Sequence, residues 1–125
     1  MATGLENLWV YKLAEDLEIE VHQLTKKFPR DEFYRSVDQL RRSSASVANN
    51  IAESYHKTTL KEKVRFVDIA MGEAEETKRN IMKSLRKEFF AASEGVPLVE
   101  RYTILLKGLN AFRRFLELSR TKTKN

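Results

Sequence analysis

The chain has 125 residues, of which 42% are hydrophobic and 33% charged, and it carries a formal net charge of +5. This size fits one domain that can bury a core without cross-links, and the composition excludes disorder as the default. The absence of cysteine excludes a disulfide framework and a thiolate site. No signal-peptide pattern opens the chain and no apolar run could span a bilayer, so we expect a soluble, cytoplasmic domain over 1–125.

Periodicity predicts two helices in the first half of the chain. The first covers about 7–27 and ends before Pro29, because proline cannot continue the hydrogen-bond ladder. The second starts at about Asp31 or Ser36 and ends at Tyr55. Apolar residues three and four positions apart give each helix one apolar face: Leu13, Leu17, Val21, Leu24 and Phe28 in the first, and Leu40, Val47, Ile51 and Tyr55 in the second.

Two more helices follow. Thr59 and Glu62 form a capping-box pattern before a third helix that reaches about Phe89 and is expected to be the longest. We expect a loop at 93–95, with Pro97 in the first turn of a fourth helix. The short connections predict an all-α, antiparallel, up-down-up-down four-helix bundle, ordered over 6–121 with a polar tail at 122–125. Its other core positions are Val67, Ala70, Met71, Ala74, Ile81, Leu85, Tyr102, Leu105, Leu109, Phe112 and Leu116.

Apolar residues exceed what one bundle core needs. Several lie beside the main stripes, which favours a second buried surface between subunits over scattered surface residues. These residues are Val10, Ile19, Phe66, Ile69, Leu106, Phe115 and Leu118. We therefore predict a homo-oligomer with Phe66, Ile69, Leu106 and Phe115 at the interface.

Consecutive asparagines at Asn49 and Asn50 interrupt the apolar pattern of the second helix. Asparagine is a poor residue for a helix interior, because its side chain competes for backbone groups. We therefore predict a structural polar network between helices or subunits, and add both residues to the predicted interface. Ligand binding is the minor alternative.

No pattern favours an enzyme. Glu53 and His56 give one Glu-x-x-His motif, whereas a di-iron bundle needs two, and Ile19 stands three residues before the other histidine, His22. No catalytic triad or phosphate loop has usable spacing. We expect no catalytic residue, metal or cofactor.

Basic residues concentrate in the second half of the chain. Residues 1–40 have a net charge of −3, whereas the segment from Lys78 onward holds 12 basic and 4 acidic residues. Rows at helical spacing can contact several phosphates, which predicts backbone-directed nucleic-acid binding, with a merely solvated basic surface as the alternative. The predicted contacts are Arg41, Arg42, Lys78, Arg79, Lys83, Arg86, Lys87, Lys107, Arg113, Arg114 and Arg120.

Four segments resemble one known family. They are the opening 7–14, the connection Leu24–Pro29 with Glu32 and Tyr34, the run Gln39–Glu53, which is the strongest match, and Arg65–Gly72. Together they resemble the 23S rRNA intervening-sequence proteins, also called four-helix-bundle proteins. This family includes the accessory variability determinant of diversity-generating retroelements.

The resemblance covers roughly the first three helices. It implies a four-helix bundle that assembles as a ring, typically a pentamer. Its retroelement members bind nucleic acid and a partner reverse transcriptase. Two departures stand out: Ser54 replaces a usual glycine, and 78–90 is more basic than is usual, which favours a polyanion partner. We expect a non-enzymatic accessory protein that binds nucleic acid, with a reverse transcriptase as its candidate partner. The alternative is a structural or interaction protein of the same family.

Overall fold

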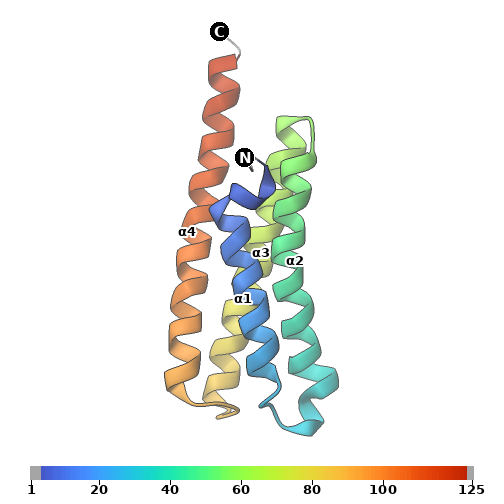
Figure 1. The fold of residues 1–125 in the computed structure, drawn as a ribbon, viewed down its shortest axis with the longest axis vertical. Coiled ribbons are helices and arrows are strands. Elements are labelled where there is room, and N and C mark those ends of the chain that lie inside the picture. The colour runs from blue at the N-terminus through green and yellow to red at the C-terminus, as the bar shows by residue number, and fades with distance from the viewer. Residues whose placement is uncertain (1–3, 124–125) are drawn as a thin grey trace.

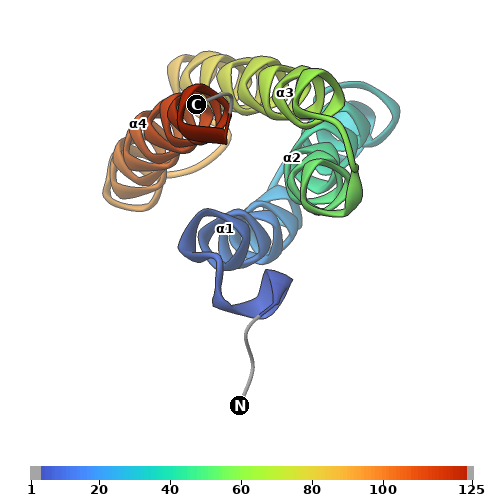
Figure 2. The same cartoon turned by 90° about the horizontal axis from the view of Figure 1, so that it is seen from above.

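A computed structural model describes the backbone of residues 4–123 and the side chains through Ser119. In this part of the chain, four long helices follow a short 3-10 turn at Leu5–Asn7: α1 (Trp9–Thr25), α2 (Asp38–His56), α3 (Leu60–Arg86) and α4 (Ala92–Thr123) (Figure 1). Consecutive helices run in opposite directions and are arranged in chain order around a common axis (Figure 2). The predicted all-α four-helix bundle is confirmed for the single chain, while the ring and the single-domain bounds stay predictions.

The core is one apolar cluster to which all four helices contribute. Most of the stripe residues predicted from periodicity are buried in it, because side chains at i, i+3 and i+4 share one helix face. The largest fully buried members are Leu17, Leu40, Ile51, Ile81, Tyr102, Leu105 and Leu109. This cluster fixes the rotation of each helix about its own axis, and so decides which basic residues face outward.

Two burial predictions are wrong. Tyr55 is 38% exposed, and the neighbouring Ser54 takes the buried position, with its hydroxyl donating to the Ile51 carbonyl oxygen at 2.7 Å. Val10, which we placed beside the first stripe, is only 1% exposed, because the first turn of α1 packs against Gly108 of α4.

The connection between α1 and α2 is itself helical in irregular forms. Helix α1 ends at Thr25, two residues before its predicted end, and Pro29 is extended. A 3-10 turn follows at Arg30–Glu32, and a π-helical turn at Phe33–Val37 leads into α2. Both predicted starts of the second helix therefore lie ahead of the regular α-helix. The backbone of Arg35 leaves helical geometry (φ −120°, ψ −106°), which makes this turn the irregular entry to α2.

The third helix begins and ends with recognisable caps. Thr59 accepts a hydrogen bond from the Glu62 amide at 3.2 Å, as its capping pattern predicts. At the other end Glu88 has a positive φ of 62°, and the Phe89 amide donates to the Ser84 carbonyl oxygen at 3.1 Å. This bonding is a Schellman-type end, so α3 stops at Arg86, ahead of the predicted Phe89.

The start and length of α4 also differ from prediction. The expected loop at 93–95 is the first turn of α4, and the true connection is 87–91. Gly95 is buried against the Phe90 ring, so closely that a Cβ atom at this position would lie 2.3 Å from the ring. With 32 residues against 27 for α3, α4 is the longest helix, and its carboxyl end projects beyond the other three (Figure 1). Part of the predicted polar tail at 122–125 is thus helical backbone, and residues 124–125 lie outside the described part.

Candidate nucleic-acid interface

The last turns of α3 present a row of cations on the outer face of the bundle. Arg79, Lys83 and Arg86 are all exposed, as their three- and four-residue spacing predicts. None of them forms an ion pair with any residue in the described part of the chain. Lys87 follows at the helix end and is exposed, whereas Lys78 is half-buried. These guanidinium and ammonium groups are therefore available to an external anion.

The α1–α2 connection brings further cations to the same end of the molecule. The hydrogen bond that Ser36 donates to Glu32 (2.6 Å) makes the largest contribution to lowering the pKa of the Glu32 carboxyl. The positive charges of Lys87 and Arg35 lie near enough to lower this pKa further. Lys26 and Arg30 are exposed on this connection, and Lys27 pairs with Glu94 at the start of α4. We call Lys26, Arg30, Arg35, Arg79, Lys83, Arg86 and Lys87 the basic end.

Sequence reasoning missed the part of the basic end that precedes α2. The net charge of residues 1–40 is negative because acidic residues, those of α1 included, outnumber the basic ones in this span. The available signal was local: the short stretch from Lys26 to Arg35 holds four basic residues. Only the fold, which brings the connection and the end of α3 to the same end of the bundle (Figure 1), joins them to the predicted row.

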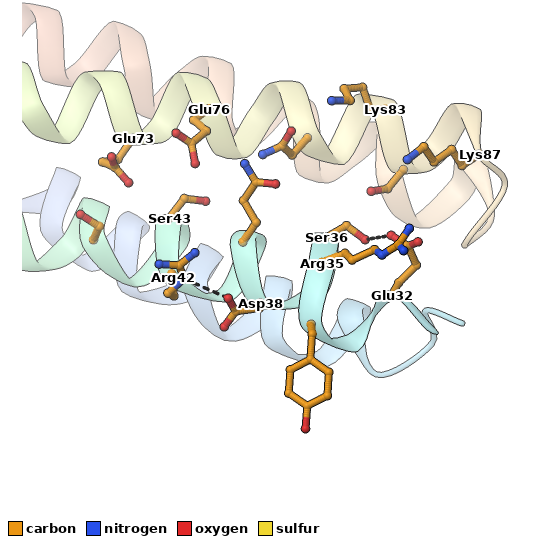
Figure 3. A pocket seen from close by; sticks show the side chains of 15 residues that line it. Glu32, Arg35, Ser36, Asp38, Arg42, Ser43, Glu73, Glu76, Lys83 and Lys87 are labelled. Carbon is orange, nitrogen blue, oxygen red and sulfur yellow. Dashed lines mark hydrogen bonds and ion pairs between the residues drawn. The ribbon is translucent and has the colours of Figure 1, made fainter. Parts of the chain in front are cut away.

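A groove of about 700 Å³ runs between the start of α2 and the second half of α3 (Figure 3). Lys83 of α3 and Lys87, which directly follows this helix, lie toward one end of the groove, and Glu73 and Glu76 lie toward the other end. The opposite wall comes from the π-helical turn and the first turns of α2. Its side chains include Glu32, Arg35, Ser36, Asp38, Arg42, Ser43 and Ser46.

Buried polar side chains, Ser43, Asn80 and Ser84, line this groove. The hydroxyl oxygen of Ser43 is 2.7 Å from that of buried Thr77 behind it, which joins α2 to α3. Asn80 is 9% exposed, and its Nδ2 has no hydrogen-bond partner in the described part of the chain. Buried amide donors are nearly always bonded, so Asn80 is an exception that needs an explanation.

Glu73 lines the groove, where its surroundings disfavour the ionised form of its carboxyl group. Partial burial raises its pKa above the ordinary value, and the negative charge of Glu76 adds to the increase. A hydrogen bond with Ser46 acts in the opposite direction. Ionised Glu73 is therefore held at a cost to folding, and it offers acceptor oxygens toward the groove (Figure 3).

The predicted contacts on α2 lie apart from the α3 row. The Arg41 Nε donates to Thr25 of α1 at 2.9 Å, so its side chain spans the α1–α2 boundary. Arg42 lines the groove, but its Nε pairs with Asp38 at 3.1 Å. The sequence treated the two arginines as one pair, and the helix turns them toward different neighbours.

The predicted contacts on α4 divide as well. Lys107 and Arg114 are exposed and share the outer face of the helix. Arg113 is half-buried and pairs with Asp68 of α3 at 2.7 Å and with Glu117 at 3.0 Å. These residues lie toward the end opposite the basic end, because α4 starts beside the end of α3 and runs back along it (Figure 1). The side chain of Arg120 lies outside the described part.

The predicted interface residues differ in exposure. Phe115 is 62% exposed and Ile69 is 36% exposed, whereas Leu106 packs against the core within the chain. Phe66 is half-buried, with the cations of Lys57 and Arg65 over its ring at 5.0 and 4.6 Å. Two other apolar residues of α4, Ile104 and Leu118, are also exposed.

Among the described residues, the asparagine pair forms no hydrogen bond between helices. The Asn50 Nδ2 donates to the Ser46 carbonyl oxygen at 2.8 Å and to its hydroxyl at 2.9 Å, both within α2. Asn49 is exposed. Within one chain the predicted interhelical network is therefore not observed, and a contact between subunits stays a prediction.

Two other kinds of site are absent from the described residues. No group of three or more histidine and carboxylate side chains is placed to hold a metal ion. No helix there has the length and apolarity that crossing a bilayer requires.

The fold and surface define a small, basic four-helix-bundle protein. The chain belongs to the 23S rRNA-intervening sequence protein family, whose sequence model matches residues 6–111. This match confirms the resemblance seen in the sequence and extends it into the fourth helix.

One similar solved structure is a protein of unknown function from the S23 ribosomal protein family of Bacteroides thetaiotaomicron VPI-5482. The TM-score is 0.77 at 20% identity, with 84% of this chain and 95% of that chain covered. At this identity the likeness shows the fold alone. No curated protein matches the chain.

Proposed function

We propose that this protein binds the sugar-phosphate backbone of nucleic acid through the basic end. The observation that carries the proposal is the row Arg79, Lys83 and Arg86, which is exposed and free of ion pairs with the described residues. A cation already paired to a carboxylate gains little from a phosphate, whereas an unpaired one releases the counterions condensed on the strand.

The position of the row supports a surface that reaches beyond one helix. Arg35 and Lys87 flank Glu32, and Lys83 and Lys87 lie on the groove beside them. Cations from two connected parts of the chain therefore face the same region of solvent. Such an arrangement raises the local potential and speeds encounter with a polyanion.

The test is a titration of labelled RNA and DNA at low and moderate salt. The triple variant Arg79→Gln/Lys83→Gln/Arg86→Gln should weaken binding, and each lost phosphate contact should reduce the slope of log affinity against log salt by about 0.7 to 0.9. The fold should survive, because all three side chains are exposed.

The matched control removes three charges elsewhere. Lys12, Lys61 and Arg65 are exposed, lie outside the basic end and are not among the predicted contacts, so replacing them with Gln should change the salt slope much less. Equal effects of the two triple variants would refute the location. No binding of the wild type at low salt would refute the proposed function itself.

We also propose that the chain self-associates through the outer part of α4, as the ring expected from the family resemblance requires. Phe115 and Leu118 are 62% and 63% exposed, in the carboxyl-terminal part of α4. Exposed apolar neighbours of this kind mark interaction surfaces. They equally support the second candidate function, a structural or interaction protein that does not bind nucleic acid.

The substitution Phe115→Asp should lower the mass measured by light scattering, because an unpaired charge opposes burial in an apolar interface. Asn110→Asp is the control, since it adds the same charge at an exposed position on the same helix. A monomeric wild type at micromolar concentration would contradict self-association. A reverse-transcriptase partner is a separate proposal, which copurification with a coexpressed reverse transcriptase would test.

A further inference from the structure

The groove between α2 and α3 holds a donor that nothing in the described chain satisfies. Asn80 is nine-tenths buried and lines this groove, yet its Nδ2 lacks a partner there. The neighbouring Ser43 and Thr77 bond to each other, so burial on this seam does not by itself prevent pairing. The Nδ2 atom is itself shielded from solvent, so the Asn80 side chain must turn toward the groove for its amide to donate to a ligand acceptor.

The charges around the groove indicate what kind of ligand fits. Four carboxylates and four cations line it, so its formal charge balances and a simple anion or cation has no advantage. Glu73 and Glu76 offer acceptors near the Asn80 donor on α3, within one turn or two of the helix. A flat molecule whose edge carries both donors and acceptors matches this lining, and the exposed edge of a nucleobase has that character.

The groove also opens onto the proposed backbone-binding surface. Lys83 belongs to the exposed row with Arg79 and Arg86, and it lines the groove together with Lys87. A strand whose phosphates follow the row would therefore pass the groove, with both lysines beside it. The volume of about 700 Å³ lies within the range of small-molecule pockets.

We propose that this groove receives an unpaired base of a single-stranded nucleic acid. With its side-chain amide turned toward the groove, Asn80 donates to an acceptor on the base edge, Glu76 accepts from an amino or imino group, and Lys83 and Lys87 contact the flanking phosphates. Bases in a duplex have their pairing edges occupied, so the site selects single strands or loops. This inference rests on the proposed backbone-binding function and adds a preference to it.

The first experiment separates base from phosphate. The four nucleoside 5′-monophosphates and ribose 5-phosphate are titrated into isotope-labelled protein, and amide shifts are followed by NMR. At least one nucleotide should shift the Asn80 side-chain amide and neighbouring α2–α3 resonances at concentrations where ribose 5-phosphate does not. Equal shifts from all five compounds would overturn the base site.

The second experiment uses variants with matched charge changes. Asn80→Asp replaces the donor with an acceptor, and Asn110→Asp makes the same change at an exposed position on α4. We expect Asn80→Asp to weaken nucleotide and single-strand binding at least tenfold relative to Asn110→Asp. Equal affinities for the two variants would overturn the proposal.

A second variant pair guards against misfolding of the first. Glu76 lines the groove, whereas Glu75 is exposed and does not line it. Glu76→Leu removes an acceptor and should reduce the preference for single strands over a duplex of equal length, while Glu75→Leu should keep that preference. An unchanged preference in Glu76→Leu would count against the groove.

The measurements distinguish a failure of the base site from a failure of backbone binding. If single strands and duplexes bind alike with a steep salt slope, backbone binding stands and the base site is refuted. If no strand binds at low salt, backbone binding is refuted, and the base site falls with it because its flanking contacts are lost.

Discussion

The seam between α1 and α4 and the seam between α2 and α3 are built from different chemistry. At the first, Trp9 lies over Gly108, Val10 and Leu109 are buried, and an ion pair between Arg101 and Glu20 lies at the exposed edge. At the second, buried hydroxyl and amide groups occupy the contact: Ser43, Thr77, Asn80 and Ser84.

This difference separates stability from binding. An apolar seam gains free energy from area removed from water and has no need of directional contacts. A polar seam is favourable only where its groups are bonded, so it keeps specific geometry and leaves open positions where a partner is missing. The groove and the unpaired Asn80 amide lie on the polar seam, and the close-packed glycine contact lies on the apolar one. Facing α1, α4 also buries the Tyr102 hydroxyl without a hydrogen-bond partner among the described residues, but Tyr102 does not line the groove.

The largest effect expected from this comparison is at Gly108. A Cβ atom there would lie 2.2 Å from Cη2 of Trp9 and 2.9 Å from Cγ1 of Val10. We expect Gly108→Ala to reduce the free energy of unfolding by about 1–3 kcal/mol, as overpacking does, measured by urea denaturation. A loss below about 0.5 kcal/mol would show that the seam adapts and that its close packing matters little.

Gly72 is the matched control for that substitution. It is exposed in the middle of α3, and a Cβ atom added there would meet no packing neighbour within 4 Å. Gly72→Ala should raise the free energy of unfolding by roughly 0.5–1 kcal/mol, because alanine loses less backbone entropy in a helix than glycine. The same chemical change should thus have opposite signs at the two sites.

A middle-sized effect is expected on the polar seam. Ser43→Ala leaves the Thr77 hydroxyl without its partner across α2 and α3, although that hydroxyl still donates to the Glu73 carbonyl oxygen at 2.8 Å. We expect a loss of about 1 kcal/mol in the free energy of unfolding.

The double variant Ser43→Ala/Thr77→Val tests whether this loss comes from the hydrogen bond. It should cost less than the sum of the two single changes, by at least about 0.5 kcal/mol, since both polar groups are removed together. Additive losses would mean that the two hydroxyls stabilise the seam independently.

Features that follow from a local pattern in the sequence were predictable, whereas features that need two distant segments were not. Helix faces follow from periodicity, so the core and the outward row of Arg79, Lys83 and Arg86 were predictable from spacing alone. The Thr59 cap was predictable because it needs only a local pattern.

Features that depend on two distant segments were not predictable. Ser93, Glu94 and Gly95 have loop composition, yet they begin α4 because Gly95 must approach the Phe90 ring closely. Asn80 and Arg35 carried no signal as groove residues, because the groove exists only where the π-helical turn and α2 pack beside α3.

The smallest effect expected is a pH-dependent one at Glu73 on the polar seam. Partial burial and the charge of Glu76 raise the pKa of Glu73 in the folded protein, so its ionised form opposes folding above that pKa. Glu73→Gln should therefore stabilise the protein near pH 7. Screening of this partly exposed group limits the gain to about 0.5 kcal/mol or less.

As the pH falls through the folded pKa, Glu73 takes up a proton and its own penalty disappears, so the advantage of the variant should vanish at acid pH. Chemical denaturation of both proteins across pH 3–7 measures the difference, with exposed Glu75→Gln as the control. An advantage of the same size at both ends of that range would show that packing of the amide, and not the carboxylate charge, is responsible.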